Sequence, residues 1–137
     1  MSPALVLDAE AVSSLARPHG TTFREVHAAL EAARRMQRDV VTPAVILAEL
    51  YRGPRRNQVV DACLSRETGI RVRDTDRSFA RYVGGVLAAA GADSDDMVDA
   101  HVVAAAAEAG GGVVLTSDAS DLTRLAASYP NVHVASF

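Results

Sequence analysis

The sequence contains no lysine and no tryptophan, and it has a single cysteine. All 14 basic residues among the 137 are arginines, against 17 acidic residues. P-loop NTPases and enzymes that form Schiff bases both need a lysine, so its absence excludes both classes. It also excludes receiver domains and haloacid-dehalogenase phosphatases, two small α/β folds that rely on a lysine. The lone Cys63 cannot form an internal disulfide, which favours a reducing compartment, and its apolar neighbours predict a place in the core.

Long apolar runs are also missing. The longest uncharged run, residues 125–137, has 13 residues, several of them polar, whereas a membrane-spanning helix needs about 20 apolar residues. No basic segment precedes Asp8, so the sequence predicts no secretory signal peptide. The length and the hydrophobic content of 49% predict one compact domain over residues 1–137. We therefore expect a soluble, cytoplasmic protein.

Short apolar runs alternate along the chain with segments of helical periodicity. Five runs predict strands, at residues 4–7, 40–41, 70–72, 113–115 and 132–135. Seven segments predict helices, at residues 9–17, 21–39, 42–53, 59–66, 76–90, 95–109 and 118–129. In the third of these, Thr42 is the predicted N-cap and Pro43 the first helical residue. The strands are continuously apolar, which is typical of a parallel sheet covered by helices on both faces.

Four acidic residues stand at strand ends or on apolar helix faces. Asp8 and Asp118 each follow a predicted strand, and each could simply cap the next helix. Glu49 and Asp99 lie on the apolar side of their helices, where an ionised carboxylate is costly unless it is paired or binds a metal. An ion pair with Arg52 is the alternative for Glu49, whereas Asp99 has no basic residue within four positions.

These four acids are predicted to share one pocket, because ligands of parallel α/β sheets collect at the carboxyl ends of the strands. Oxygen ligands without cysteine or clustered histidine favour Mg²⁺ or Mn²⁺ over zinc. The histidines have no metal-binding spacing, and we expect them to be surface or incidental residues; they are His19, His27, His101 and His133.

The order of the acidic segments resembles that of the PIN domain family, in particular VapC-like toxins. An apolar strand ending in Asp8 is similar to the first motif of that family. Residues 42–50, TPAVILAEL, are similar to the second motif and contain Glu49. Residues 99–106, DAHVVAAA, resemble the third motif, and residues 116–122, TSDASDL, resemble the fourth. The similarity extends over the whole chain.

The last motif departs from the family pattern, because one extra residue separates its two acids and Leu122 stands where phenylalanine is usual. We therefore favour Asp118 as the fourth ligand and keep Asp121 as the alternative. Ala9 follows the first acid where the family often has serine or threonine.

The resemblance implies a three-layer α/β/α fold with a central parallel sheet of about five strands. It also implies an Mg²⁺- or Mn²⁺-dependent endoribonuclease that acts as the toxin of a toxin–antitoxin pair. The partners would be RNA, a second copy in a homodimer and a VapB-like antitoxin. The predicted catalytic and metal-binding residues are Asp8, Glu49, Asp99 and Asp118. The residues predicted to position water or phosphate are Thr116, Ser117 and Asp96.

Arginine must supply the positive charge for RNA, and the dense group after the Glu49 helix is the predicted backbone contact; it consists of Arg52, Arg55 and Arg56. The antitoxin is expected to place a basic side chain among the four acids and to pack on the helices at 42–53 and 21–39. Two other functions remain open, a metal-dependent DNase and a PIN-fold binding module without catalytic activity.

Overall fold

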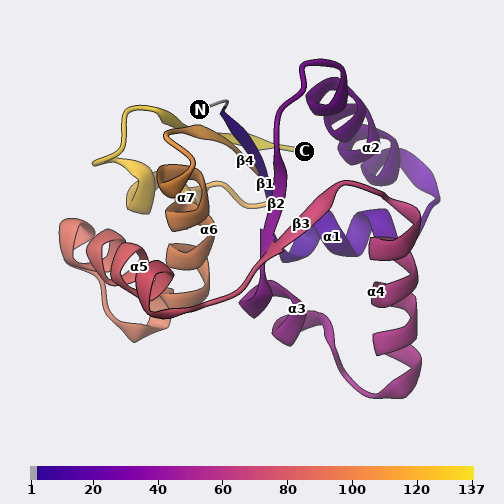
Figure 1. Cartoon of the computed structure of the whole chain (residues 1–137), viewed down its shortest axis with the longest axis horizontal. Helices are drawn as coiled ribbons and strands as arrows, with labels where there is room; N and C mark the ends of the chain where they lie inside the picture. Colours follow the sequence, from indigo (N-terminus) through magenta and orange to yellow (C-terminus); the bar gives the residue numbers. More distant parts are fainter. Residues whose placement is uncertain (1–2) are drawn as a thin grey trace.

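A parallel sheet forms the centre of residues 3–137, the part of the chain that the computed structural model describes (Figure 1). Its strands run in the order β3 (Ile70–Arg73), β2 (Val40–Pro43), β1 (Ala4–Leu7), β4 (Gly112–Thr116) and β5 (Val132–Ser136). Every neighbouring pair is parallel. The prediction of about five parallel strands is therefore confirmed.

Helices cover both faces of this sheet. On one face lie α1 (Ala9–Ala16), α2 (Gly20–Arg35) and α4 (Pro54–Arg66), and on the other lie α5 (Arg77–Ala90), α6 (Met97–Glu108) and α7 (Ser120–Ala126) (Figure 1). The short α3 (Ala44–Leu50) follows β2, and the 3₁₀ helix η1 (Ser94–Asp96) leads into α6. These layers confirm the α/β/α fold. Within residues 3–137, no helix combines the length and the apolar character needed to cross a membrane.

The core extends over both faces of the sheet, with buried side chains from α1, α2 and α4 on one face and from α5, α6 and α7 on the other. On the second face, α6 contacts β1, β2, β4 and β5. All four residues of β1 are buried, and so is the run from Ala100 to Ala106 in α6. His101 belongs to this run and is only 6% exposed, so the expectation of a surface or incidental residue is wrong for this histidine. Its Nδ1 lies 2.7 Å from the Met97 carbonyl oxygen, and its ring meets Phe79 edge-on. Cys63 is buried, as predicted.

The bounds of several predicted helices differ in the structure; α4, for example, begins at Pro54 rather than at residue 59, and α5 begins at Arg77 rather than at residue 76. Thr42 and Pro43 belong to β2 rather than to the helix, because they pair with Val72 and Arg73 of β3. The Thr42 hydroxyl also donates a 2.9 Å hydrogen bond to the Leu7 carbonyl of β1. Helix α3 therefore begins at Ala44. The segment at 95–109 divides into η1 and α6, and α7 occupies only the middle of the segment at 118–129.

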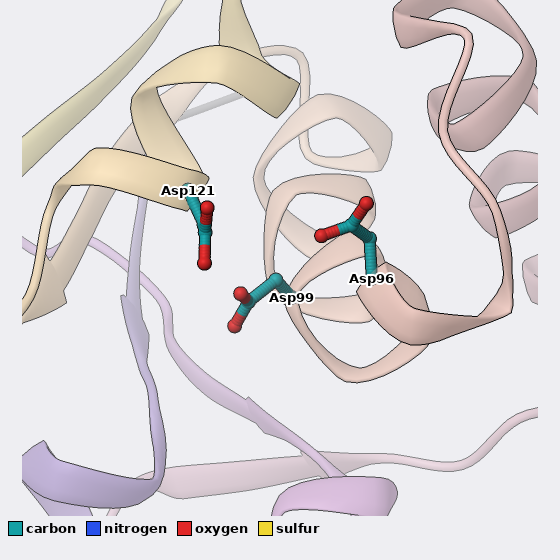
Figure 2. A group of neighbouring side chains, drawn as sticks. All are labelled: Asp96, Asp99 and Asp121. Atoms are coloured by element: carbon teal, nitrogen blue, oxygen red, sulfur yellow. The ribbon is translucent and has the colours of Figure 1, made fainter.

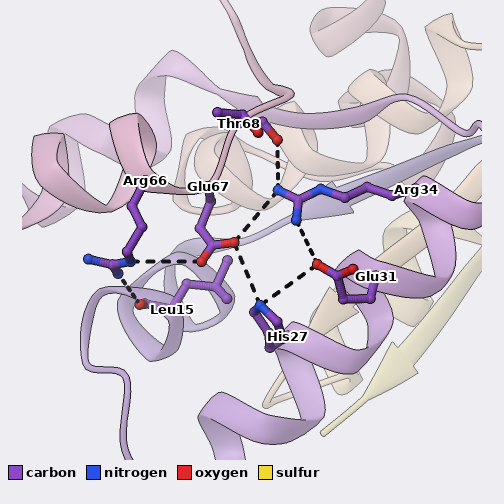
Figure 3. A network of polar contacts seen from close by, with 7 residues as sticks. All are labelled: Leu15, His27, Glu31, Arg34, Arg66, Glu67 and Thr68. Carbon is purple, nitrogen blue, oxygen red and sulfur yellow. Dashed lines mark hydrogen bonds and ion pairs between the residues drawn. The ribbon is translucent and has the colours of Figure 1, made fainter.

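A buried carboxylate joins the helices of the α1/α2/α4 layer (Figure 3). The Glu67 side chain is 8% exposed and lies 3.6 Å from Arg34 of α2 and 3.8 Å each from His27 and Arg66. Arg34 and Arg66 also donate hydrogen bonds to the backbone carbonyls of Thr68 and Leu15. A buried charge is tolerated when it has such partners, so this network fixes α2 and α4 against α1.

Candidate metal-binding site

The site lies at the carboxyl edge of the sheet, between β1 and β4. The chain passes from β1 outward to β2 and β3 on one side and continues with β4 and β5 on the other. Ligands of doubly wound sheets bind at such a point, where the strand order reverses. A cavity of about 190 Å³ opens there. Its lining includes six carboxylates, those of Asp8, Glu10, Glu49, Asp99, Asp118 and Asp121.

Asp8 is held in this cavity by its position between β1 and α1. Its Oδ1 accepts a 2.9 Å hydrogen bond from the Ala11 amide, so the capping role foreseen as an alternative is present. The residue is also 9% exposed and faces the cavity. Burial raises the pKa of Asp8 above 3.8, although the Thr116 side chain and the Ala11 amide oppose this rise. The same carboxylate therefore caps a helix and contributes to the site.

Glu49 reaches the rim of the cavity from α3. It is exposed on the helix surface, while its neighbour Ile46 is buried and lines the same cavity. Arg52, its predicted alternative partner, instead donates to the carbonyl oxygens of Ala48 and Tyr51. The Arg52 guanidinium therefore caps carbonyl groups at the carboxyl end of α3, and Arg52 does not line the cavity.

Asp99 is the centre of the acidic group. It lies in the first turn of α6 and is half-buried. Burial raises the pKa of Asp99 above 3.8, and four negative charges raise it further. In order of effect, these belong to Asp121, Asp8, Asp96 and Glu49. A carboxylate under this much repulsion is stabilised by any cation that binds beside it.

Three carboxylates come close enough to hold one ion, and Figure 2 shows the Asp121 and Asp99 carboxylates near each other, with Asp96 at the start of α6. Asp96, Asp99 and Asp121 each offer an oxygen atom, and these atoms lie within 4.8 Å of one another. Asp121 comes from α7, whereas Asp96 and Asp99 flank the start of α6. All three offer hard oxygen donors, which suit Mg²⁺ or Mn²⁺.

Asp118, which the sequence favoured as the fourth ligand, has a different environment. Its Oδ1 accepts hydrogen bonds of 3.2 and 3.0 Å from the amide and hydroxyl of Ser120. It lines the cavity but is not part of the three-acid group. The Thr116 hydroxyl exchanges two 3.1 Å hydrogen bonds with the Asp118 backbone and thereby shapes this loop. Ser117 is exposed in the cavity lining.

Sequence reasoning gave Asp96 only a supporting role, although it belongs to the three-acid group. One signal could have indicated more: Asp96 precedes Asp99 by three residues, and residues three apart lie on the same side of a helix. Glu10, in the first turn of α1, also lines the cavity, although it was not among the predicted site residues.

The predicted arginine group divides between two places. Arg55 and Arg56 line a second cavity of about 300 Å³ between α1, α3 and α4, together with Arg17 of the α1 end. The remaining lining of this arginine-rimmed groove is mostly apolar and includes Leu50 and the 45%-exposed Val59. The three predicted arginines therefore lie outside the acidic cavity, on adjoining surfaces.

A family model described as PIN domain matches residues 5–127 of the chain. None of the curated proteins compared with the chain matches its sequence. The acids of the site all lie within the matched range.

Solved structures share the fold at low sequence identity. VapBC2 from Rickettsia felis, bound to a DNA fragment from its promoter, is 18% identical with a TM-score of 0.67, and the match covers 98% of both chains. FitAB bound to the IR36 DNA fragment is 18% identical with a TM-score of 0.62 and covers 96% of this chain and 94% of that one. FitAcB from Neisseria gonorrhoeae is 17% identical with a TM-score of 0.57, over 95% of each. These likenesses concern the fold.

Proposed function

We propose that this chain, which belongs to the PIN domain family, is a metal-dependent endoribonuclease and the toxin of a toxin–antitoxin pair. PIN domains are typically nucleases. The observation that carries the proposal is Asp99, a half-buried carboxylate surrounded by four further acids in a cavity at the point where the strand order reverses. A carboxylate cluster of this kind suits a hard divalent cation, and it repels a phosphodiester unless a cation is present.

Asp99, Asp121 and Asp96 are the residues best placed to hold Mg²⁺ or Mn²⁺, with Asp8 and Glu49 on the adjoining walls. When bound, a divalent cation supplies Lewis acidity toward water and toward phosphate oxygens. Asp8, fixed by the Ala11 amide, holds a constant orientation toward the cavity. The exposed Ser117 lines the cavity and is placed to donate to a phosphate oxygen, whereas the Thr116 hydroxyl donates to the Asp118 carbonyl.

The partner in this proposal is a VapB-like antitoxin. VapBC2 and FitAB, whose folds resemble this one, are complexes. The arginine-rimmed groove between α1, α3 and α4 is an apolar surface on which apolar antitoxin residues could pack. The groove includes the end of α3, which was predicted to contact the antitoxin, but its other walls come from α1 and α4 and not from α2. A basic antitoxin side chain would then enter the acidic cavity and compete with the metal. We also propose a homodimer, as the family resemblance implies.

Cleavage assays test the proposed function directly. Purified protein should cut single-stranded RNA in the presence of Mg²⁺ or Mn²⁺, and EDTA should stop the reaction. A duplex DNA substrate in a parallel reaction distinguishes the DNase alternative. If the protein, with metal present, cleaves neither the DNA nor any member of a broad panel of RNAs, a binding module without catalytic activity is favoured instead.

The fourth ligand can be identified by comparing two isosteric variants of the same loop. We expect Mn²⁺ to raise the melting temperature of the wild-type protein, because binding only the native state stabilises it by about 2.7 kcal/mol at 100 times Kd. Asp121→Asn should reduce that rise, since Asp121 belongs to the three-acid group. Asp118→Asn should retain most of it, since Asp118 is not part of the three-acid group and its Oδ1 accepts hydrogen bonds from Ser120. Differential scanning fluorimetry over a Mn²⁺ titration provides the measurement, and the opposite ranking would restore Asp118 as the ligand.

A further inference from the structure

Within the part of the chain that the structure describes, Arg124 is the one basic residue that forms an ion pair with an acid of the three-acid group. The Arg124 guanidinium of α7 is 2.9 Å from Oδ1 of Asp96, and the Asp96 side chain is only 18% exposed. Among residues 3–137, this is the one ion pair or hydrogen bond that the Asp96 carboxylate makes. Asp96 immediately precedes α6, yet its side chain does not cap the amides of that helix. The orientation of Asp96 therefore depends on Arg124.

The placement of Arg124 follows from the spacing on its helix. Arg124 comes three residues after Asp121, so both side chains leave the same side of α7. From there Arg124 reaches across to the residue before α6, and α6 carries Asp99 in its first turn. The ion pair thus links α7, which provides Asp121, to η1 and α6, which provide Asp96 and Asp99. The hydrogen bond to Asp96 raises the pKa of Arg124, and the negative charges of Asp96, Asp121 and Asp93 raise it further.

We infer that Arg124 is a positioning residue that holds the Asp96 carboxylate beside Asp99 and Asp121 and thereby sets the affinity of this group for a divalent cation. This role rests on the proposed metal-dependent function and assigns it one more residue. Arg124 touches an acid of the group and not the substrate.

Two effects of the arginine oppose each other, and the structure indicates which is larger. A positive charge near a cation site weakens cation binding, but the Arg124 side chain is 48% exposed, so water and salt screen its repulsion. Loss of a group that orients a metal ligand typically weakens metal binding 10- to 100-fold. Removal of Arg124 should therefore weaken cation binding, although it also removes a positive charge.

Calorimetric titration with Mn²⁺ tests whether removal of Arg124 weakens or strengthens cation binding. Arg124→Ala should bind Mn²⁺ about 10-fold more weakly than the wild-type protein, and Arg124→Lys should recover part of the loss. Arg35→Ala is the matched control, because it removes an exposed arginine of α2 that lies outside the acidic cavity. The control should bind as the wild-type protein does. An Arg124→Ala protein with unchanged or tighter Mn²⁺ binding would overturn the positioning role.

A double-mutant cycle separates positioning from a general charge effect. In the Asp96→Asn background, Arg124→Ala should change the Mn²⁺ affinity by less than about twofold, because the group that it orients no longer carries charge. An undiminished effect of Arg124→Ala in that background would contradict the inference. If the wild-type protein binds no Mn²⁺, both the metal-dependent function and the role of Arg124 are wrong. If the wild-type protein binds Mn²⁺ but the effects of the two substitutions on its affinity simply add, only the role of Arg124 is wrong.

Discussion

Replacement of Asp99 by asparagine is expected to abolish RNA cleavage and to leave the protein at least as stable as before. The asparagine would keep the shape of the side chain but lose the charge at the centre of the acidic group. Loss of one preorganised electrostatic contribution typically costs about 10²- to 10³-fold in rate, and loss of the central ligand should reach or exceed that range. The measurement is the initial rate of cleavage at saturating Mg²⁺.

The expected gain in stability follows from the direction of the pKa shift. Burial and the neighbouring acids raise the pKa of Asp99 in the folded state above 3.8. Between 3.8 and the raised value the folded state binds more protons than the unfolded state, so stability is lost as the pH rises through that window. At neutral pH, without metal, the wild-type protein carries this penalty and Asp99→Asn does not. In EDTA, the melting temperature of Asp99→Asn should therefore be equal to or higher than that of the wild-type protein.

Lowering the pH provides the check on this explanation. The difference in melting temperature between Asp99→Asn and the wild-type protein should shrink as the pH approaches 3.8, where the wild-type carboxyl group becomes protonated. Glu25→Gln, which neutralises an exposed acid on α2 away from the cavity, should change neither the cleavage rate nor this pH dependence. If Asp99→Asn still cleaves RNA, Asp99 is not part of the site. If Asp99→Asn is markedly less stable than the wild-type protein, the proposed repulsion between Asp99 and the neighbouring acids is wrong.

Gly112→Ala is expected to have the largest effect on folding. Gly112 begins β4 with φ at 158°, and a Cβ atom there would overlap the Ala4 carbonyl oxygen of β1. Neither strand can move away, because β1 is wholly buried at the centre of the sheet. We expect a cost of about 4 kcal/mol or more, in the range that marks a severe steric defect.

A glycine in a helix provides the matched control for this substitution. Gly85 lies within α5, and a Cβ atom at this position would meet nothing within 4 Å. Gly85→Ala should stabilise the protein by about 0.5–1 kcal/mol, because alanine favours the helix more than glycine does. Urea unfolding followed by circular dichroism measures both variants. Failure of Gly112→Ala to accumulate as folded protein agrees with the expectation, and a free energy of unfolding within about 1 kcal/mol of wild type would contradict it.

The sequence by itself determined the alternation of strands and helices, because burial of a parallel sheet on both faces requires continuous apolar strands. It also predicted that Asp8, Glu49, Asp99 and Asp118 line one cavity, which they do, because ligand sites of parallel α/β sheets collect at the carboxyl ends of the strands. Glu49, however, is exposed rather than set on a buried helix face. Local features were less decisive: Thr42 looked like a helix cap, but its hydroxyl donates to Leu7 of the neighbouring strand.

Only the tertiary structure decided which acid of the last motif joins Asp99. Asp118 and Asp121 are equally acidic and three residues apart, so their sequence spacing cannot rank them. In the folded chain the Ser120 amide and hydroxyl donate to Oδ1 of Asp118, while the start of α7 brings Asp121 into one group with Asp99 and Asp96. The contact of Arg124 with Asp96 joins residues 28 positions apart, and no local pattern indicates it. Periodicity reveals which side of an element is buried, but pairing between side chains of different elements depends on how those elements pack.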